Sequence, residues 1–244
     1  MANLRFYSNN PLALGASIQL SDSAAAHATK ALRLNVGDSA IVFNGDGFDY
    51  YCELTSIKKN EVLAKITNVK QVSNESPLRI TLLQAISSGD RMDYTIQKAV
   101  ELGVTSIQPI TSQRSVVKLS AERAEKRTEH WQNVAVSACE QSGRAFVPNV
   151  LSPISLQSWL ATNLQANATR ILLNPVGALR LTELPKPKDE IQLLIGAEGG
   201  LAQFEIDLAC SHGFKSIVLG PRILRTETAA LATISAMQTI WGDF

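Results

Sequence analysis

Two short apolar runs near the carboxyl end of the chain each stop in a loop, and a helical pattern follows each loop. The first run, Leu193–Ile195, leads into residues 196–200, which we call the glycine loop. The second leads into residues 219–225, which we call the arginine loop. Open α/β sheets bind ligands beyond the carboxyl ends of their strands. The two blocks therefore predict a single ligand pocket to which both loops contribute.

Three glycines, Gly196, Gly199 and Gly200, dominate the glycine loop. Glycine lets backbone N–H groups approach a ligand closely and tolerates a positive φ. The loop has neither the G-x-G-x-x-G spacing of dinucleotide sites nor the Gly-Lys-Ser/Thr end of a phosphate loop. It is therefore either a tight turn or a ligand cradle, with Glu198 in its middle as a hydrogen-bond acceptor.

The arginine loop places the guanidinium groups of Arg222 and Arg225 beside the start of a helix. A helix N-terminus carries a partial positive charge and favours anions. Thr226 is predicted to be the N-cap, with Glu227 in the first turn. The alternative is an ordinary helix cap flanked by solvated arginines.

Strand and helix patterns alternate from residue 78 onward. Strands are predicted at residues 78–86, 104–110, 170–173, 191–195 and 216–219. Asp90 and Ser120 are predicted to cap helices, and further helices are predicted to begin at Ser155, with Leu164 pointing inward, and near residue 202. The last helix carries an apolar stripe that suits either the core or a dimer contact: Ala230, Ile234, Met237 and Trp241. Such alternation is typical of a parallel sheet covered on both faces.

The first part of the chain has a different pattern, mostly of short strands. Residues 40–43, 48–57 and 61–69 read as strands, and Asn44–Gly47 is a turn signal. Asp22 or Ser23 is predicted to cap a short Ala-rich helix, and a small barrel is the expected fold. The polar stretch 70–77 ends in proline and reads as a linker. We therefore predict two domains, residues 1–72 and 73–244.

The composition is that of a globular protein. Hydrophobic residues make up 45% of the 244 residues and charged residues 18%. No apolar run approaches the roughly 20 residues of a membrane helix, and no signal peptide is evident. Cys52, Cys139 and Cys210 are scattered, which predicts buried inert thiols in a reducing cytosol, without zinc or disulfides. Because the net charge is only +1, any nucleic-acid surface must come from local clusters of arginine and lysine.

The motif IGAEGG followed by LGPRILRTETA resembles the paired signature of the SPOUT methyltransferases. Within that superfamily it resembles the RsmE family of 16S ribosomal RNA uridine-N3 methyltransferases. Residues 91–118 and the CEQSGR block at 139–144 agree, and the resemblance covers nearly the whole chain. Ala197 and Ala202 depart from the proline and serine that are usual in the family, which puts cofactor affinity in question more than activity.

The resemblance implies an α/β fold with a parallel sheet and a C-terminal trefoil knot, preceded by a PUA-like RNA-binding domain. It also implies a homodimer, a cytoplasmic location and S-adenosylmethionine as cofactor, with no metal. It assigns the cofactor to apolar strand ends and glycine-loop backbone. These positions are Leu172, Leu173, Asn174, Ile195, Gly196, Glu198, Gly199, Gly200, Leu219, Gly220, Ile223, Leu224 and Thr226.

The implied reaction methylates N3 of a uridine, position 1498 of 16S ribosomal RNA. That nitrogen carries a proton at neutral pH and lies on the pairing edge, so the base must be unpaired or flipped out. Arg225, and second Arg222, are expected to stabilise the charge that develops on the base. Glu227 or Glu198 could accept the proton, or either could simply hold a neighbouring group in place.

Seven basic residues are predicted to contact RNA: Arg5, Lys30, Arg33, Arg91, Lys98, Arg114 and Arg144. Lys118 is a weaker candidate. For each of them the alternative is a surface charge or an ion pair, as for Lys98 with Glu101. Two other functions stay open from the sequence. One is a non-catalytic ribosome-assembly factor with a vestigial cofactor loop, and the other is an α/β enzyme that binds a nucleotide phosphate at the glycine loop.

Overall fold

The computed structural model describes residues 4–58, 61–115, 120–164 and 167–244. The chain forms two compact units, which we treat separately. Unit 1 comprises residues 1–75 and 139–147, and unit 2 comprises residues 76–138 and 148–244. The division of the chain at residue 72 stays a prediction. A single cut would not assign residues 139–147 to unit 1, where their contacts place them.

Unit 1 is built on a five-stranded sheet in the order β1-β3-β4-β5-β2. The strands are β1 (Arg5–Tyr7), β2 (Ser17–Gln19), β3 (Ser39–Phe43), β4 (Phe48–Lys58) and β5 (Glu61–Gln71). The three longer strands confirm the sequence prediction. The strands β1 and β2 were not predicted, because three residues carry too little periodicity. Gly45 and Gly47 both have φ of 91° in the turn between β3 and β4, where a side chain would be strained.

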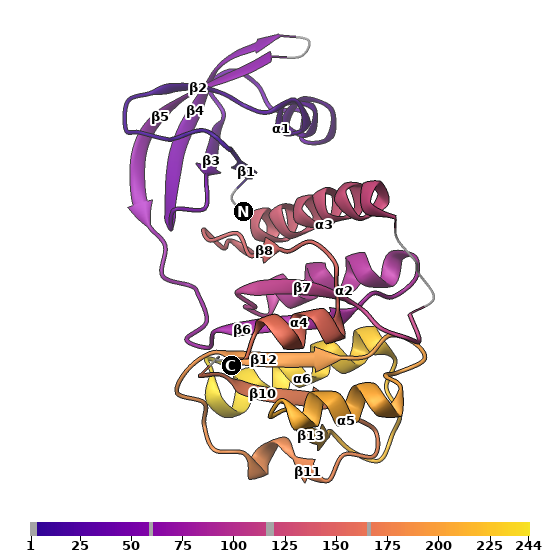
Figure 1. The fold of residues 1–244 in the computed structure, drawn as a ribbon. Coiled ribbons are helices and arrows are strands. Elements are labelled where there is room, and N and C mark those ends of the chain that lie inside the picture. The colour runs from indigo at the N-terminus through magenta and orange to yellow at the C-terminus, as the bar shows by residue number, and fades with distance from the viewer. Residues whose placement is uncertain (1–3, 59–60, 116–119, 165–166) are drawn as a thin grey trace. The chain divides into compact units, whose positions relative to one another are not determined.

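A short helical segment covers part of this sheet (Figure 1). It consists of α1 (Asp22–Ala26) followed by the π-helical turn η1 (His27–Ala31). The predicted cap at Asp22 or Ser23 is wrong, because the Ser21 side chain accepts the hydrogen bond from Ala24 N. The small side chains of Ala24, Ala25 and Ala28 join the core of unit 1.

Unit 2 contains an eight-stranded sheet that is parallel, as the alternating pattern predicts, although three of its strands, each of two residues, were not predicted. The order is β11-β13-β10-β12-β6-β7-β8, and β9 pairs with β7. The strands are β6 (Ile80–Ala85), β7 (Ser106–Thr111), β8 (Asn149–Val150), β9 (Ile154–Ser155), β10 (Thr169–Leu173), β11 (Leu179–Arg180), β12 (Ile191–Ile195) and β13 (Lys215–Val218). The central strands are buried on both faces and apolar, since helices cover both sides.

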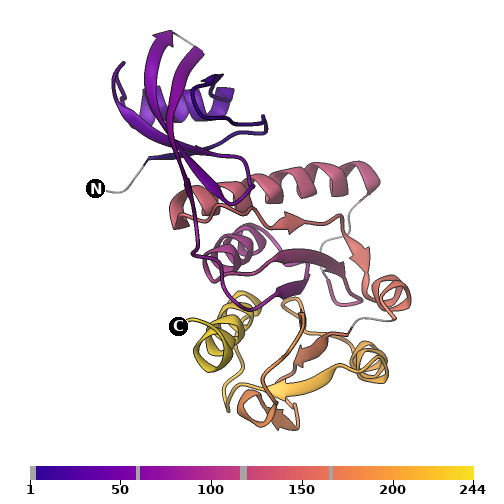
Figure 2. The same cartoon turned by 90° about the vertical axis from the view of Figure 1, so that its left-hand side faces the viewer.

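Figure 2 shows helices on both faces of this sheet, with α2 and α6 on one side and α4 and α5 on the other. The helices are α2 (Asp90–Glu101), α3 (Ala121–Ser142), α4 (Leu156–Thr162), α5 (Gln203–Ser211) and α6 (Thr226–Trp241), with a 3-10 turn η2 (Leu181–Glu183). None of the helices in the described ranges is long and apolar enough to cross a membrane.

Three features of the helices refine or contradict the sequence predictions. The stripe on α6 is buried, so it belongs to the core of unit 2. Leu164 is 66% exposed, contrary to prediction, because α4 ends at Thr162 and the chain has already left the helix. Asp90 is not the cap of α2. Gly89 occupies that position without a side-chain bond.

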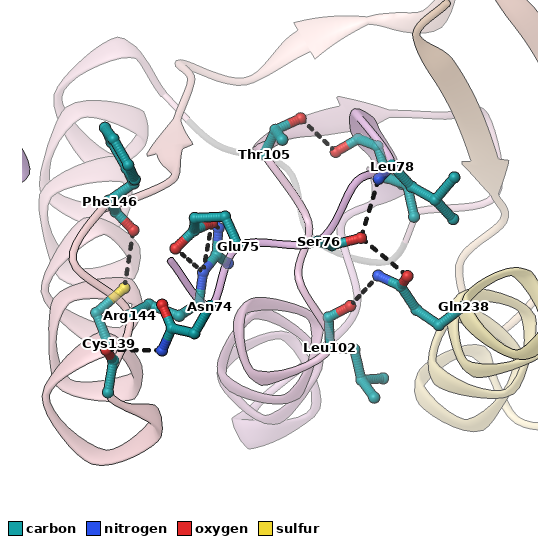
Figure 3. A network of polar contacts seen from close by, with 12 residues as sticks. Asn74, Glu75, Ser76, Leu78, Leu102, Thr105, Cys139, Arg144, Phe146 and Gln238 are labelled. Carbon is teal, nitrogen blue, oxygen red and sulfur yellow. Dashed lines mark hydrogen bonds and ion pairs between the residues drawn. The ribbon is translucent and has the colours of Figure 1, made fainter. Parts of the chain in front are cut away.

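The far end of α6 is fixed by one buried side chain, Gln238 (Figure 3). Its Oε1 accepts a hydrogen bond of 2.9 Å from Ser76 Oγ, and its Nε2 donates one of 2.7 Å to Leu102 O. Gly103 lies so close that an added Cβ would be 2.9 Å from Gln238 Nε2. The helix that begins at the arginine loop is therefore anchored at its other end to the end of α2 and the start of unit 2.

Candidate active site

A cavity of about 720 Å³ lies within unit 2, at the carboxyl ends of β10, β12 and β13 and the start of α6. The glycine loop and the arginine loop both line it, which confirms that they share one pocket. All thirteen residues predicted for the cofactor are among its lining residues, as are Arg222, Arg225 and Glu227. Arg91 and Arg114, predicted to contact RNA, line it as well.

The floor and the rim of the cavity differ in exposure. Leu172 and Ile195, at the ends of their strands, are almost fully buried. At the rim, Val176 is 83% exposed and Ile223 is 84% exposed. The pocket can therefore enclose an apolar group at its floor, and its rim offers apolar surface to a second molecule.

A buried hydrogen-bond relay joins the glycine loop to α6 and β6. Thr226 Oγ1 donates to Gly196 O at 2.6 Å and accepts from Gln84 Nε2 at 3.0 Å. Thr226 was predicted to be the N-cap, and that prediction is wrong. Arg225 occupies the cap position without a side-chain bond, and Thr226 is the first helical residue.

The glycine loop is a tight turn as well as one wall of the pocket. Gly200 N donates to Ala197 O at 2.9 Å, and Gly200 has φ of +67°. An added Cβ on Gly196 would lie 2.9 Å from the carbonyl carbon of Gly200. The five residues therefore form a tight turn that also lines the pocket, and the binding of a ligand by this loop stays a prediction.

Neighbouring segments hold this turn from the side. Arg114 Nη1 donates to Gly199 O at 3.1 Å. The carboxylate of Glu205 accepts hydrogen bonds of 2.8 Å from Gln113 N and from Ala202 N. The second of these bonds satisfies one of the free N–H groups at the start of α5, where the Ala202 side chain cannot act as a cap.

Glu198 is held at three points by the segment that follows β6. Its Oε1 accepts from Ser88 N and Ser88 Oγ, both at 2.8 Å, and from Arg91 Nη1 at 2.9 Å. Burial alone would raise the pKa of this carboxyl group. The hydrogen bonds donated by Ser88, by the N–H of Glu198 itself and by Arg91 outweigh it and lower the pKa to about 2.

The arginine loop carries polar groups that lack partners. Arg222 and Arg225 are exposed, and within the described residues their side chains make no hydrogen bond or ion pair. Glu227 Oε2 is buried and has no hydrogen-bond partner in that part of the chain. A buried carboxylate oxygen without a donor costs free energy, so a ligand that donates a hydrogen bond to it would be favoured.

Comparisons with known proteins agree with this geometry. Residues 74–238 match the RNA methyltransferase domain model, and residues 20–67 match the RNA methyltransferase PUA domain model. The ribosomal RNA small subunit methyltransferase E of Buchnera aphidicola is 37% identical over 98% of this chain and 97% of its own length. The chain belongs to the ribosomal RNA small subunit methyltransferase E family.

Solved structures of methyltransferases resemble it along their whole length. The methyltransferase E of Neisseria gonorrhoeae, bound to S-adenosyl methionine, has a TM-score of 0.92 and 43% identity, with 99% of each chain covered. A methyltransferase of Legionella pneumophila in complex with the same cofactor has a TM-score of 0.95 and 36% identity, with 100% of each covered. The chain is therefore an RNA methyltransferase with a small N-terminal sheet domain.

Two arginines predicted to contact RNA are buried in unit 1 instead. Arg5 is 9% exposed and pairs with Asp49 at 2.5 Å, and its Nη2 donates to Arg144 O at 3.0 Å. Arg144 is 5% exposed and pairs with Glu75 at 2.5 Å (Figure 3). Buried, paired guanidinium groups hold the segment 139–147 in unit 1, so we assign these two residues a structural role.

The other predicted RNA contacts have diverse surroundings. Lys30 and Arg33 are exposed in unit 1, and Arg33 is the one non-glycine residue with positive φ, 55°, in the described ranges. Lys98 pairs with Glu101 at 2.7 Å, which confirms the ion pair considered from the sequence. Lys118 lies outside the described residues.

The cysteines mostly behave as expected. Burial raises the pKa of Cys52 to about 11 and that of Cys139 to about 12, so both thiols are protonated at neutral pH. Cys210 is exposed, contrary to the prediction that all three are buried, because it lies on the outer side of α5. No group of side chains suited to a metal ion occurs among the described residues.

Sequence reasoning missed the residues that support the pocket from behind, Gln84 and Ser88 above all. Gln84 lies near the carboxyl end of β6, and Ser88 follows that strand. The strand β6 is the direct neighbour of β12 in the sheet. The available signal was the strand at 78–86, whose carboxyl end also had to lie at this edge. A polar residue there could have been added to the predicted site.

Proposed function

We propose that this chain transfers a methyl group from S-adenosylmethionine to N3 of uridine 1498 in 16S ribosomal RNA of the small ribosomal subunit. The observation that carries the proposal is the pocket of unit 2, in which both signature loops of the family meet. Its residues fit the cofactor. Leu172, Leu173 and Ile195 form an apolar floor for an adenine ring, and the glycine backbone offers hydrogen bonds to a ribose.

The cofactor supplies an electrophilic methyl group on its sulfonium. The chain holds the target uridine unpaired, with N3 toward the pocket. As the N3 proton leaves, negative charge spreads onto the two flanking oxygens of the base. Arg225, and second Arg222, stabilise this charge because their guanidinium groups have no competing partner within the described chain and lie at a helix N-terminus.

Glu227 is our preferred acceptor for the N3 proton. It lines the pocket in the first turn of α6, two residues after Arg225, and its buried Oε2 has no donor in the described chain. Glu198 suits that role less, because its Oε1 already accepts three hydrogen bonds. Among the described residues that line the pocket there is no histidine.

RNA contacts in unit 1 come from Lys30 and Arg33 in this proposal. Both are exposed, and the left-handed backbone at Arg33 is a local strain of the kind that accompanies functional positions. In unit 2, Arg91 and Arg114 line the pocket and Lys98 lies on α2, although each of the three already has a protein partner. Replacement of both Lys30 and Arg33 by alanine should weaken RNA binding, and replacement of the exposed Lys65 and Lys70 is a charge-matched control.

A trefoil knot is part of the proposal. The strand β13 pairs with both β10 and β11, although it follows both in the chain. The connection between β10 and β11 packs directly on β13, since an added Cβ on Gly177 would lie 2.5 Å from the carbonyl carbon of Ile217. This arrangement supports a chain that passes under its own loop before forming α6. Mechanical stretching from both ends should then give a contour length shorter than that of an unknotted chain.

The proposed enzyme is a homodimer that acts in the cytoplasm. The exposed rim residues Val176 and Ile223 would be covered by the second subunit. The location follows from the substrate, because ribosomal RNA is modified where ribosomes are assembled. Light scattering of the purified protein should give twice the mass of one chain.

Calorimetry and a transfer assay test the activity. S-adenosylmethionine and its homocysteine product should bind, whereas ATP and NAD should not. Small subunits from a strain that lacks the modification should gain one methyl group, and mass mapping should place it on N3 of the uridine. Tight RNA binding without methyl transfer would instead indicate an assembly factor, and ATP binding would indicate a nucleotide enzyme.

A further inference from the structure

The carboxylate of Glu198 is unusual among the acidic groups of the pocket because one oxygen accepts three hydrogen bonds. Ser88 contributes two of them, from its N–H and its hydroxyl, and Arg91 contributes the third. The Glu198 side chain is only 24% exposed. Ser88 lies in the segment that joins β6 to α2, and Arg91 lies in the first turn of α2, so the glycine loop is tied to the start of that helix and to the loop before it.

This tie lies in the part of the glycine loop that most needs one. Residues 199 and 200 are both glycine, and glycine loses more conformational freedom on ordering than any other residue. The relay through Thr226 fixes the first residue of the loop, Gly196, and Arg114 contacts the carbonyl of Gly199. Glu198 is the one side chain between these two points that reaches a neighbouring element by hydrogen bonds.

We propose that Ser88, Arg91 and Glu198 form a clamp that fixes the glycine loop before the cofactor binds, and that Glu198 is a positioning residue rather than the proton acceptor. A pre-formed loop binds more tightly because its ordering cost is met on folding. The inference rests on the proposed function, since it concerns the loop to which that function assigns the cofactor.

The surroundings of Glu198 support this role. The other charged groups of the pocket are Arg91, Arg114, Arg222 and Arg225, with Glu227 as the second carboxylate. A carboxylate that already accepts three donors is stabilised as the anion and is a weak base. Glu227, which also lines the pocket and has a buried oxygen without a donor in the described chain, is the contrasting case.

The test uses the full chain and four variants: Ser88→Ala, Arg91→Lys, Arg91→Gln and Glu198→Gln. Affinity for S-adenosylmethionine and its homocysteine product is measured by calorimetry, and kcat is measured with saturating cofactor as a function of pH. We expect Glu198→Gln and Arg91→Gln each to weaken cofactor binding about tenfold, and we expect Glu198→Gln to keep kcat within threefold of the wild type with an unchanged pH profile. Arg91→Lys should recover part of the affinity, and the double variant Arg91→Gln with Glu198→Gln should be no weaker than either single variant.

Glu101→Gln is the matched control, because it removes the carboxylate of an ion pair on the same helix, away from the pocket. It should leave cofactor affinity unchanged. Ser88→Ala, which removes a single hydroxyl, guards against variants that fail to fold. It should weaken binding twofold to fivefold.

Several results would overturn the clamp. Normal cofactor affinity in Glu198→Gln together with a hundredfold lower kcat and a changed pH profile would make Glu198 the proton acceptor. Normal affinity and normal kcat in all four variants would leave the clamp without effect. A wild-type protein that binds no S-adenosylmethionine would refute the proposed function itself, and the clamp with it. Loss of affinity in the variants alone leaves the proposed function standing.

Discussion

The glycine loop and the arginine loop line the same pocket but are built in opposite ways. Groups from α6 and from the segments after β6 and β7 bond to the glycine loop at Gly196, Glu198 and Gly199. In the arginine loop, Arg222 and Arg225 have no partner in the described chain, and Ile223 is 84% exposed. A fixed wall suits a small ligand of constant shape, and free cations suit a large anionic substrate that supplies the partner.

The largest effect that this contrast predicts is on catalysis. Arg225→Ala should lower the rate of methyl transfer at least about a hundredfold, because a guanidinium that stabilises developing charge is worth roughly 3 kcal/mol. Cofactor affinity should stay within a few-fold, since the glycine loop is untouched. Rates are measured with excess cofactor, and affinity is measured by calorimetry.

Arg123→Ala, on the exposed start of α3, is the control for that variant because it also removes one surface guanidinium. It should have wild-type activity. Turnover at the wild-type rate in Arg225→Ala would remove Arg225 from the chemistry. An equal loss of cofactor affinity would show that the two loops do not divide their tasks.

The second prediction concerns the glycines of the two loops. Gly196→Ala should destabilise the fold by about 1–3 kcal/mol, because the new Cβ would meet only backbone atoms, 2.9–3.0 Å away. Gly220→Ala should change stability little, since nothing lies within 4 Å of the corresponding position. Thermal and denaturant unfolding measure both. Similar losses for the two variants would contradict the difference in packing.

The third prediction breaks the relay between the loops. Thr226→Val keeps the shape of the side chain but removes the hydroxyl that donates to Gly196 O and accepts from Gln84. Gly196 O loses this donor, and the buried Gln84 amide keeps only its bond to Ala85 O, so unfolding should become easier by about 1–3 kcal/mol. Thr228→Val, two residues on and exposed, is the matched control and should lie within about 0.5 kcal/mol of the wild type.

The fold and the two loops show which features could be predicted from the sequence. Strands, helices and the chemistry of both loops follow from patterns within a few residues, and the pocket then follows from the rule for parallel sheets. Helix caps were less predictable because neighbouring candidates compete. Ser21 acts where Asp22 or Ser23 was expected, and Thr226 turns inward because Gly196 O needs a donor.

Which arginines are buried and paired could not be predicted from the sequence. Arg5 meets Asp49 across 44 residues and Arg144 meets Glu75 across 69, so only the fold reveals that they are buried and paired. Arg222 and Arg225 are the same residue type in an equally polar stretch, yet they remain without partners in the described structure. Whether an arginine serves structure or substrate depends on long-range partners, which local patterns do not contain.

The fourth prediction uses the pH dependence of the clamp. The pKa of Glu198 is lowered from 4.5 to about 2 in the folded protein, so its ionised form stabilises the fold. This contribution is fully present above pH 4.5 and is lost as the pH falls toward 2. Glu198→Gln should therefore be less stable than the wild type at pH 7, by about 1 kcal/mol since the site is partly solvated. The difference should shrink below pH 4.5.

Unfolding of both proteins between pH 2.5 and 7 measures that difference. The Glu122–Lys126 pair, which is exposed on α3, provides the control. Glu122→Gln should differ little from the wild type over the same range. A difference for Glu198→Gln that stays constant down to pH 2.5 would mean that the charge of Glu198 does not stabilise the loop.

The smallest expected effect is a gain in stability just beyond the glycine loop. Ala202 is the N-cap of α5, with φ of −70° and ψ of 155°, but its side chain offers no acceptor. A serine there could accept from Glu205 N, the third position of the helix, while the Glu205 carboxylate keeps its bond to Ala202 N. Ala202→Ser should therefore stabilise the protein by about 0.5–1 kcal/mol, since Ser155 makes the same bond at the start of α4, to Ser158 N at 3.0 Å. The reverse change, Ser155→Ala, should cost a similar amount. A loss of stability in Ala202→Ser would mean that the buried surroundings of that position lack room for the hydroxyl. The bond from Ala202 N to the Glu205 carboxylate would then be the complete cap of this helix.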